Sequence, residues 1–90
     1  MKSIINEEYR CNNCGSPFNL ERHHCIFGTA NRKKAEEDGL WVWLCHDCHH
    51  GVHNGNNWLK EMLQKEAQEY WEEEYGDRDA FIKRYGRSYL

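Results

Sequence analysis

The sequence predicts a small α+β domain held together by a metal ion, followed by a helical segment. The chain has 90 residues, a length that buries too little apolar surface to be comfortably stable without a metal or disulfide bonds. Its five cysteines include two CxxC pairs, at 11–14 and 45–48. A β-prone run leads into the second pair, and apolar residues at helical spacing dominate after residue 57.

The segment between the cysteine pairs is expected to form a strand and a short helix. Residues 18–25, FNLERHHC, alternate apolar and polar side chains over part of their length, which predicts a short strand. Residues 29–39, TANRKKAEEDG, place good helix formers between Thr29, the expected N-cap, and Gly39, the expected terminator. One or two helical turns are therefore predicted there.

A second strand and a histidine-rich helix are expected next. The apolar run LWVWL, 40–44, is strongly β-prone and leads directly into the second CxxC pair. The stretch LCHDCHHGVH, 44–53, gathers two cysteines and four of the six histidines into ten positions. We expect these residues to be helical, although Gly51 lowers the intrinsic stability of a helix there.

The last third of the chain has the apolar spacing of an amphipathic helix. From Asn57 to about Tyr75, apolar residues recur three and four positions apart: Trp58, Leu59, Met62, Leu63, Ala67, Tyr70 and Trp71. Gly76 is expected to end this helix, and Asp77 is expected to cap a short second helix in RDAFIKRYG.

These patterns divide the chain into a core at 1–56 and C-terminal helices at 57–90. The helices are expected to pack on the core, on a second copy of the chain or on a protein partner. The N-terminal MKSIINEEYR lacks the apolar run of a signal peptide, and no stretch approaches the roughly 20 apolar residues of a membrane span. We therefore expect a cytoplasmic protein that does not contact a membrane.

The two CxxC pairs predict a structural zinc site. Thiols stay reduced inside cells, so paired cysteines there indicate metal binding before disulfide bonds. Cys11, Cys14, Cys45 and Cys48 can fill all four positions around a tetrahedral zinc ion, which leaves no open position for catalysis. The alternative is a set of reduced or redox-active thiols. Cys25 has no pairing partner and is expected to be a small buried apolar residue.

A zinc ion saturated by cysteines leaves the histidines for another task. His49 and His53 are four residues apart, so they can converge on a second metal from one face of a helix. His23 and His24 are neighbours on the predicted strand and cannot both face the same way. One of them can bind a metal, while the other turns to the opposite side or toward a substrate at the end of the strand.

Three pieces of the sequence together resemble the HNH endonuclease family, whose core is a ββα-metal fold. They are CNNC at 11–14, ERHHC at 21–25, which is similar to the family's Glu-x-His-His strand, and LCHDCHHGVH at 44–53, which is similar to its Leu-Cys-x-x-Cys-His-x-x-x-His ending. The resemblance covers roughly half of the chain and does not extend to the C-terminal helices. It implies a metal-dependent endonuclease that hydrolyses phosphodiester bonds in DNA.

The resemblance also implies a role for each matching histidine. His23 matches the first metal ligand, His49 the second, and His53 a further histidine that binds the metal or the scissile phosphate. His24 matches the general base that takes a proton from the attacking water, a task that suits a neutral imidazole near pH 7. The catalytic divalent ion would be Mn²⁺, Ni²⁺, Zn²⁺ or Mg²⁺, and nitrogen ligands favour the first three.

One family position departs from the pattern. The family's asparagine, which steadies the loop that carries the base, falls on Leu40 here, and Asn31 is expected to take its place from a rearranged loop. Next to it, Arg32, Lys33 and Lys34 are candidate phosphate contacts, with a solvated loop as the equal alternative. A net charge of −3 argues against binding of nucleic acid by bulk electrostatics, so such contacts would have to be local.

Two other classes of function stay open at this point. One is a non-catalytic zinc module that binds DNA or protein and whose histidines are vestigial. The other is a small subunit that is silent until its aromatic helices dock on a partner. His24 discriminates between them and an enzyme, because a binding module has no need of a base beside a metal. The size and the isolated nuclease core resemble free-standing nucleases of bacteriophages and mobile elements.

Overall fold

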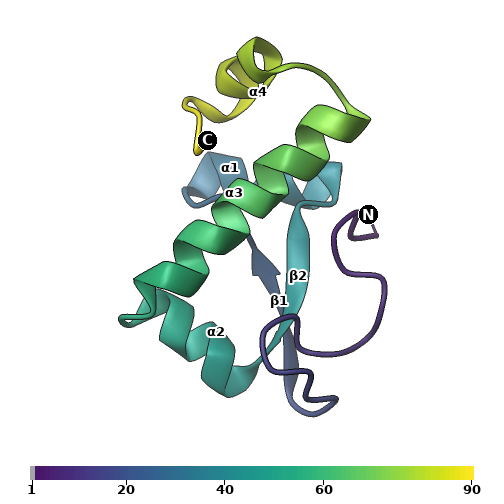
Figure 1. Ribbon diagram of the computed structural model, residues 1–90, viewed down its shortest axis with the longest axis vertical. Helices are drawn as coiled ribbons and strands as arrows, with labels where there is room; N and C mark the ends of the chain where they lie inside the picture. The colour runs from purple at the N-terminus through teal and green to yellow at the C-terminus, as the bar shows by residue number, and fades with distance from the viewer. Residues whose placement is uncertain (1) are drawn as a thin grey trace.

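The computed structural model describes residues 2–90 and contains a two-stranded sheet and four helices (Figure 1). In chain order these elements are β1 (Leu20–His24), α1 (Thr29–Asp38), β2 (Trp41–Cys45), α2 (His46–His53), α3 (Asn57–Glu74) and α4 (Arg78–Tyr85). The small α+β class is confirmed, and the strands and helices follow one another in the expected order.

The antiparallel hairpin of β1 and β2 organises the molecule. Arg22 pairs with Trp43, and His23 pairs with Val42. Successive side chains of a strand point to opposite faces, so His23 and Val42 turn toward the buried core. Arg22 and Trp43 therefore share the other face, which they also share with His24.

The strands begin and end close to the predicted boundaries, with local reasons for the differences. β1 is shorter than 18–25 because Asn19 has a positive φ of 53°, which turns the chain just before the strand begins. β2 begins at Trp41 because the N–H of Leu40 still donates to the carbonyl of Ala35 in the preceding helix. Cys25 lies directly after β1 and is fully buried, as expected.

Helix α1 is longer than predicted and starts differently. It has ten residues, and its N-cap is Gly28, with no side-chain cap, so the prediction of Thr29 as the N-cap was wrong. Gly39 ends the helix as predicted, with a left-handed φ of 75°. A side chain is excluded there, because a Cβ at this position would lie 2.5 Å from the carbonyl oxygen of Lys2.

The C-terminal helices begin where the sequence predicts. The side chain of Asn56 caps α3 by accepting from the N–H of Leu59 at 3.0 Å, and Asp77 caps α4 by accepting from the N–H of Ala80 at 2.9 Å. Helix α3 ends at Glu74, two residues before Gly76. None of the helices in residues 2–90 is long and apolar enough to cross a membrane.

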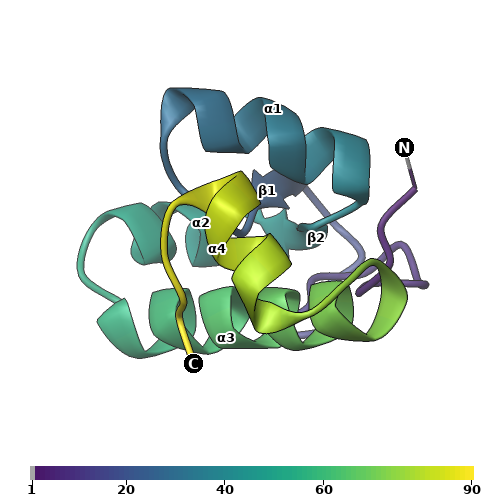
Figure 2. The same cartoon turned by 90° about the horizontal axis from the view of Figure 1, so that it is seen from above.

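One hydrophobic core joins the hairpin to the C-terminal helices. The fully buried side chains include residues of the hairpin and its flanks and residues of α3 and α4: Cys25, Ile26, Leu40, Val42, Leu44, Leu59, Leu63, Ala67 and Phe81. Figure 2 shows α1 and α3 on opposite sides of the molecule, with the hairpin and α4 between them. Residues 57–90 therefore complete the packing of residues 2–56.

Asp38, the last residue of α1, joins that helix to α3 and α4. Its carboxylate accepts hydrogen bonds from Nε1 of Trp71 at 2.8 Å, from the hydroxyl of Tyr85 at 2.7 Å and from the guanidinium of Arg84 at 2.6 and 2.9 Å. The hydroxyl of Tyr75 donates to its backbone carbonyl at 2.7 Å. The C-terminal helices thus fix the position of α1 relative to the hairpin.

Candidate functional site

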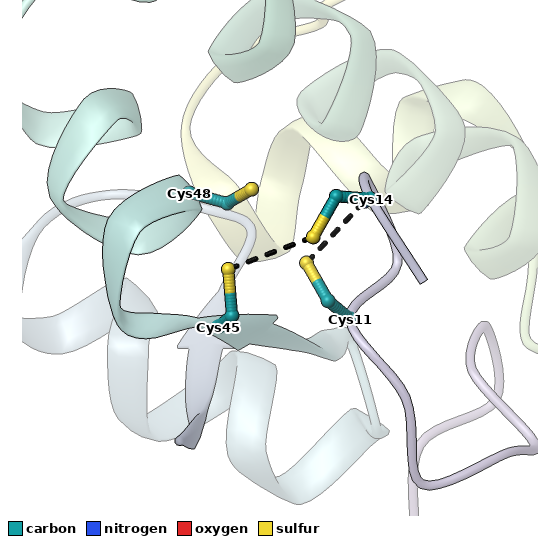
Figure 3. Close-up of side chains that lie close together, drawn as sticks. All are labelled: Cys11, Cys14, Cys45 and Cys48. Carbon is teal, nitrogen blue, oxygen red and sulfur yellow. Dashed lines mark hydrogen bonds between the residues drawn. The ribbon is translucent and has the colours of Figure 1, made fainter. Parts of the chain in front are cut away.

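Four cysteines converge from two distant parts of the chain (Figure 3). Cys11 and Cys14 come from the N-terminal segment, Cys45 from the end of β2 and Cys48 from the first turn of α2. Their sulfur atoms all lie within 4.8 Å of one another, and those of Cys14 and Cys45 are 3.7 Å apart. Sulfurs bound to one tetrahedral zinc at about 2.3 Å would be about 3.8 Å apart. The four thiols form a potential metal site consistent with structural zinc.

The surroundings of the thiols favour a bound cation. Burial raises the pKa of the Cys11 thiol, but backbone N–H groups of Cys14, Cys45 and Asn13 outweigh it and lower that pKa to about 6. The side chain of Asn13 also donates to the sulfur of Cys48 at 3.3 Å. Burial nevertheless raises the pKa of Cys48 to about 12. A backbone bond from Ser16 lowers the pKa of Cys14, but the thiols of Cys11 and Cys45 outweigh it and raise that pKa. A cation among the four sulfurs would stabilise them as thiolates, which are the form that binds a metal.

Three histidines form a second group that could hold a metal ion. His23 of β1 and His49 and His53 of α2 each offer a ring nitrogen, and these atoms lie within 4.8 Å of one another. The Nε2 atoms of His49 and His53 are 3.3 Å apart, close to the roughly 3.3–3.4 Å between two nitrogens on a tetrahedral zinc. Nε2 of His23 is buried and has no hydrogen-bond partner among residues 2–90.

An unpartnered buried nitrogen is costly unless something satisfies it, and a metal would do so. Burial and the neighbouring His49, His53 and His24 lower the pKa of His23 to about 3. Burial and His49 also lower the pKa of His53. Both rings are therefore neutral near pH 7, which is the protonation state that a metal ligand needs.

Glu21 orients the ring of His49 through its Nδ1 atom, which leaves Nε2 for a metal. Its carboxylate accepts from Nδ1 of His49 at 2.7 Å and from Nδ1 of His46 at 3.0 Å. The bond keeps the proton of His49 on Nδ1, so the lone pair of Nε2 faces the other two histidines. In many metal sites a carboxylate accepts the hydrogen bond from the ring nitrogen that a ligating histidine does not use to bind the metal.

A pocket of about 430 Å³ brings these histidines together with His24 and two arginines. It is lined by Arg22, His23, His24, Ile26, Phe27, Gly28, Thr29, Arg32, His49 and His53. The predicted metal ligands and the predicted base thus open onto one hollow at the end of β1. Phe27 stacks on His53 with ring centroids 5.2 Å apart, and the ammonium of Lys60 lies 5.7 Å from the Phe27 ring.

Glu36 of α1 holds the imidazole of His24. Nε2 of His24 lies 3.0 Å from Oε1 of Glu36, and Arg22 contacts both oxygens of the same carboxylate at 2.9 Å. Burial raises the pKa of Glu36, but the bonds from His24 and Arg22 outweigh it and lower that pKa. An ionised carboxylate only accepts, so Nε2 of His24 carries the proton and Nδ1 keeps its lone pair.

The three basic residues of α1 have different surroundings. Arg32 lines the pocket, as a phosphate contact requires. Lys33 is exposed on α1. Lys34 is engaged elsewhere, because its ammonium donates to the backbone carbonyl of Arg84 at 2.8 Å. Lys34 caps the end of α4 and does not line the pocket, so its role as a phosphate contact stays a prediction that this position does not favour.

Asn31 steadies the loop after β1 but does not contact His24. Its Nδ2 donates to the carbonyl of Phe27 at 3.1 Å and to that of Tyr85 at 3.2 Å. The loop carries the pocket residues Phe27 and Gly28. These bonds are consistent with the role expected of Asn31, which was to steady this loop, and that role stays a prediction; the imidazole of His24 is held by Glu36.

Sequence reasoning assigned no role to Glu21 or Glu36. Glu21 is two residues before His23, so strand alternation puts both on one face, and that spacing is a usable signal. Glu36 carries no such signal, because it belongs to a helix whose contact with β1 depends on the tertiary fold. Comparison of the chain with protein-family models, with curated proteins and with solved structures gave no match.

Proposed function

We propose that this protein is a metal-dependent endonuclease of the HNH type that hydrolyses phosphodiester bonds in DNA. The observation that carries the proposal is the single pocket at the end of β1, in which three convergent imidazoles, a fourth imidazole held by a carboxylate, and two arginines meet. Each group matches a need of phosphodiester hydrolysis, namely an ion to stabilise charge, a base and positive charge for the phosphate.

His24 is the general base in this proposal. Its Nδ1 accepts a proton from water as the water oxygen attacks phosphorus and the bond to the departing 3′ oxygen breaks. Glu36 stabilises the imidazolium that forms and holds the ring in one orientation. This carboxylate–histidine arrangement has the same logic as the acid–base pair of hydrolytic triads.

His23, His49 and His53 would hold the catalytic ion. A divalent cation bound there would stabilise negative charge on the phosphate and on the departing oxygen. Arg22 and Arg32 would bind phosphate oxygens at the mouth of the pocket. Arg22 is prearranged for this, because its guanidinium is held by Glu36 and lies 3.9 Å from the ring centroid of Trp41.

A nicking assay on supercoiled plasmid with Mg²⁺, Mn²⁺ or Ni²⁺ tests the proposal. His24→Ala should retain the second metal and lose roughly 10²- to 10⁴-fold in rate, the usual contribution of a positioned base. His49→Ala should lose the second metal and the activity together. His50→Ala is the matched control, because His50 is on the same helix outside both ligand sets and should change neither.

No cutting of any DNA by the parent protein with any of these ions would overturn the proposal and favour a zinc-binding interaction module. If His24→Ala cuts as fast as the parent, the protein is still a nuclease but His24 is not its general base. Activity restricted to Mg²⁺ would count against the three imidazoles as ligands, because Mg²⁺ prefers oxygen.

A further inference from the structure

A second hollow adjoins the pocket at the end of β1 and shares Arg22 with it. This hollow has a volume of about 750 Å³ and is lined by Lys2, Ser3, Asn6, Glu7, Arg22, Trp41 and Trp43. It lies on the outer face of the hairpin, the face that also carries His24. We call it the aromatic groove. A nucleic-acid strand with a phosphate in the first pocket can extend into it past Arg22.

Two tryptophans line the aromatic groove, the nearly buried Trp41 and the more accessible Trp43, and Tyr9 contacts Trp43 without lining the groove itself. The rings of Trp41 and Trp43 meet edge to face with centroids 5.0 Å apart, and Tyr9 lies 4.7 Å from Trp43. Tyr9 is 63% exposed. An aromatic ring exposed to this extent contributes little to the core, so its position beside Trp43 needs another explanation.

The charges of the aromatic groove match a nucleobase better than a phosphate. Its charged lining residues are Lys2, Glu7 and Arg22, so a carboxylate lies among its cations. Mixed charge does not attract an anion strongly. A base, by contrast, has neutral faces that stack on aromatic rings and amino groups that can donate to a carboxylate such as Glu7.

The net charge of the chain also favours base stacking as a source of affinity for nucleic acid. A chain with net charge −3 gains little affinity from counterion release on DNA. Stacking of bases on aromatic side chains contributes affinity that does not depend on net charge. Arg22 and His24 are two residues apart on β1, about 7 Å along the strand, so the aromatic groove begins close to the proposed base.

We propose that the aromatic groove binds an unpaired nucleobase next to the scissile phosphate, so that the preferred substrate is single-stranded or locally unpaired DNA. This inference rests on the proposed nuclease function and specifies its substrate. Bases within a duplex are stacked on their neighbours on both faces, so only an unpaired base can place a face against the exposed ring of Tyr9 beside Trp43.

Binding of fluorescein-labelled 12-mers, measured by anisotropy, tests this inference. The zinc-loaded protein carries His24→Ala to prevent cutting, and a gel run afterwards verifies that the strand is intact. The single-stranded 12-mer should bind more tightly than the same sequence as a duplex. Tyr9→Ala should weaken single-strand binding about 10-fold, as loss of one stacking contact does, and should leave duplex binding unchanged.

Two variants serve as matched controls. Tyr9→Phe keeps the ring and should bind within about twofold of the parent. Phe18→Ala removes a side chain that is 73% exposed but lies at another hollow, near Cys14 and His46, and should have no effect. Equal binding of the single strand by Tyr9→Ala and its parent overturns the inference. The inference is also overturned if Tyr9→Ala loses the same affinity for the duplex as for the single strand. It is overturned as well if Phe18→Ala loses as much affinity for the single strand as Tyr9→Ala does.

Failure of this inference can be told apart from failure of the nuclease proposal. Hydrolysis of bis(p-nitrophenyl) phosphate by the protein with His24 intact reports whether phosphodiester hydrolysis occurs at all, because this substrate has neither a nucleobase nor a second DNA strand. A protein that hydrolyses it but binds the single strand no better than the duplex keeps the nuclease function and loses the aromatic groove as a base-binding site.

Discussion

The carboxylate of Glu36 contacts two side chains of the candidate site, His24 and Arg22. Its helix, α1, is bonded to α4 through Asp38. A neutral imidazole can carry its proton on either nitrogen, and only a fixed partner decides which one. Glu36 makes that choice here, which leaves Nδ1 of His24 as the acceptor. The consequence is that the tautomer and orientation of the imidazole proposed as the base are set before any substrate binds.

Glu36→Ala should lower the nicking rate about 10- to 100-fold, which is less than the full contribution of the base, because His24 stays present but loses its orientation. Glu36→Gln should retain more activity, since its amide oxygen can still accept from Nε2. Metal content should stay at the parent level in both variants. Glu72→Ala, which removes a half-buried carboxylate remote from the pocket, is the control. Parent-like cutting by Glu36→Ala would contradict this role.

Among single residues, the roles that sequence reasoning could reach were those with a fixed spacing. The cysteine pairs follow from a spacing of three residues and the pair of His49 and His53 from a spacing of four, whereas the choice of His23 followed from the family resemblance. The structure brings each set together. Glu36 and Asp38 could not be assigned, because their partners lie on segments 12 to 47 positions away in sequence.

At the scale of elements, the contact between α1 and α4 is the feature that the sequence pattern does not show. Lys34 and Asn31 of α1 donate to the carbonyls of Arg84 and Tyr85, which are the last two residues of α4. These are among the carbonyls that a helix end leaves without an internal partner. Side chains of α1 therefore cap the C-terminal end of α4, and Arg84 and Tyr85 of α4 donate in turn to the carboxylate of Asp38 in α1.

Asp38→Ala should destabilise the protein by about 3–5 kcal/mol, because it leaves Trp71, Arg84 and Tyr85 with unpaired, partly buried donors. Its side chain is only 13% exposed. Glu37→Ala removes an exposed partner of the same arginine and should cost about 0–1 kcal/mol. Urea unfolding of both variants measures the difference. Equal urea midpoints for the two variants would show that the hydrogen bonds of Asp38 contribute little to the free energy of unfolding.

Element identity was easier to predict than element length. The start of α3 at Asn57 and the cap at Asp77 were predicted because apolar spacing and capping residues are local signals. The full length of α1 was not predicted, because TANRKKAEED has almost no apolar face and its helix is stabilised by contacts with β1 and α4. Tertiary contacts, rather than propensity, determine this element.

At the scale of the whole molecule, the four-cysteine site joins the N-terminal segment to the second half of the hairpin. Beyond the cysteines, that segment is held by a few hydrogen bonds, such as those from Asn12 to the carbonyl of Trp43 and from Trp43 to the side chain of Asn6. A single metal ion at the four thiols would fix residues 11–14 against 45–48. In a chain of 90 residues such a bond is a large part of the total stability.

Cys45→Ser should therefore lose zinc and unfold or become grossly destabilised, since structural zinc contributes on the order of 10 kcal/mol to folding. Cys25→Ala is the control, because Cys25 is buried but outside both ligand groups, and this variant should keep its zinc with a loss of only about 1–2 kcal/mol. Zinc content by mass spectrometry and circular dichroism distinguish the two outcomes. A folded, zinc-replete Cys45→Ser protein would exclude the site as a structural zinc centre.

Cys48 and His49 are consecutive residues of α2, and each belongs to a different ligand group. An ion that fixes the first turn of α2 through Cys48 also fixes the backbone that carries His49. The affinities of the two groups are then coupled, and by reciprocity each ion strengthens the binding of the other. If both ions bind as proposed, hydrolysis depends on the structural zinc as well as on the catalytic ion, because a chain without that zinc would lose its fold and with it the geometry of the three histidines.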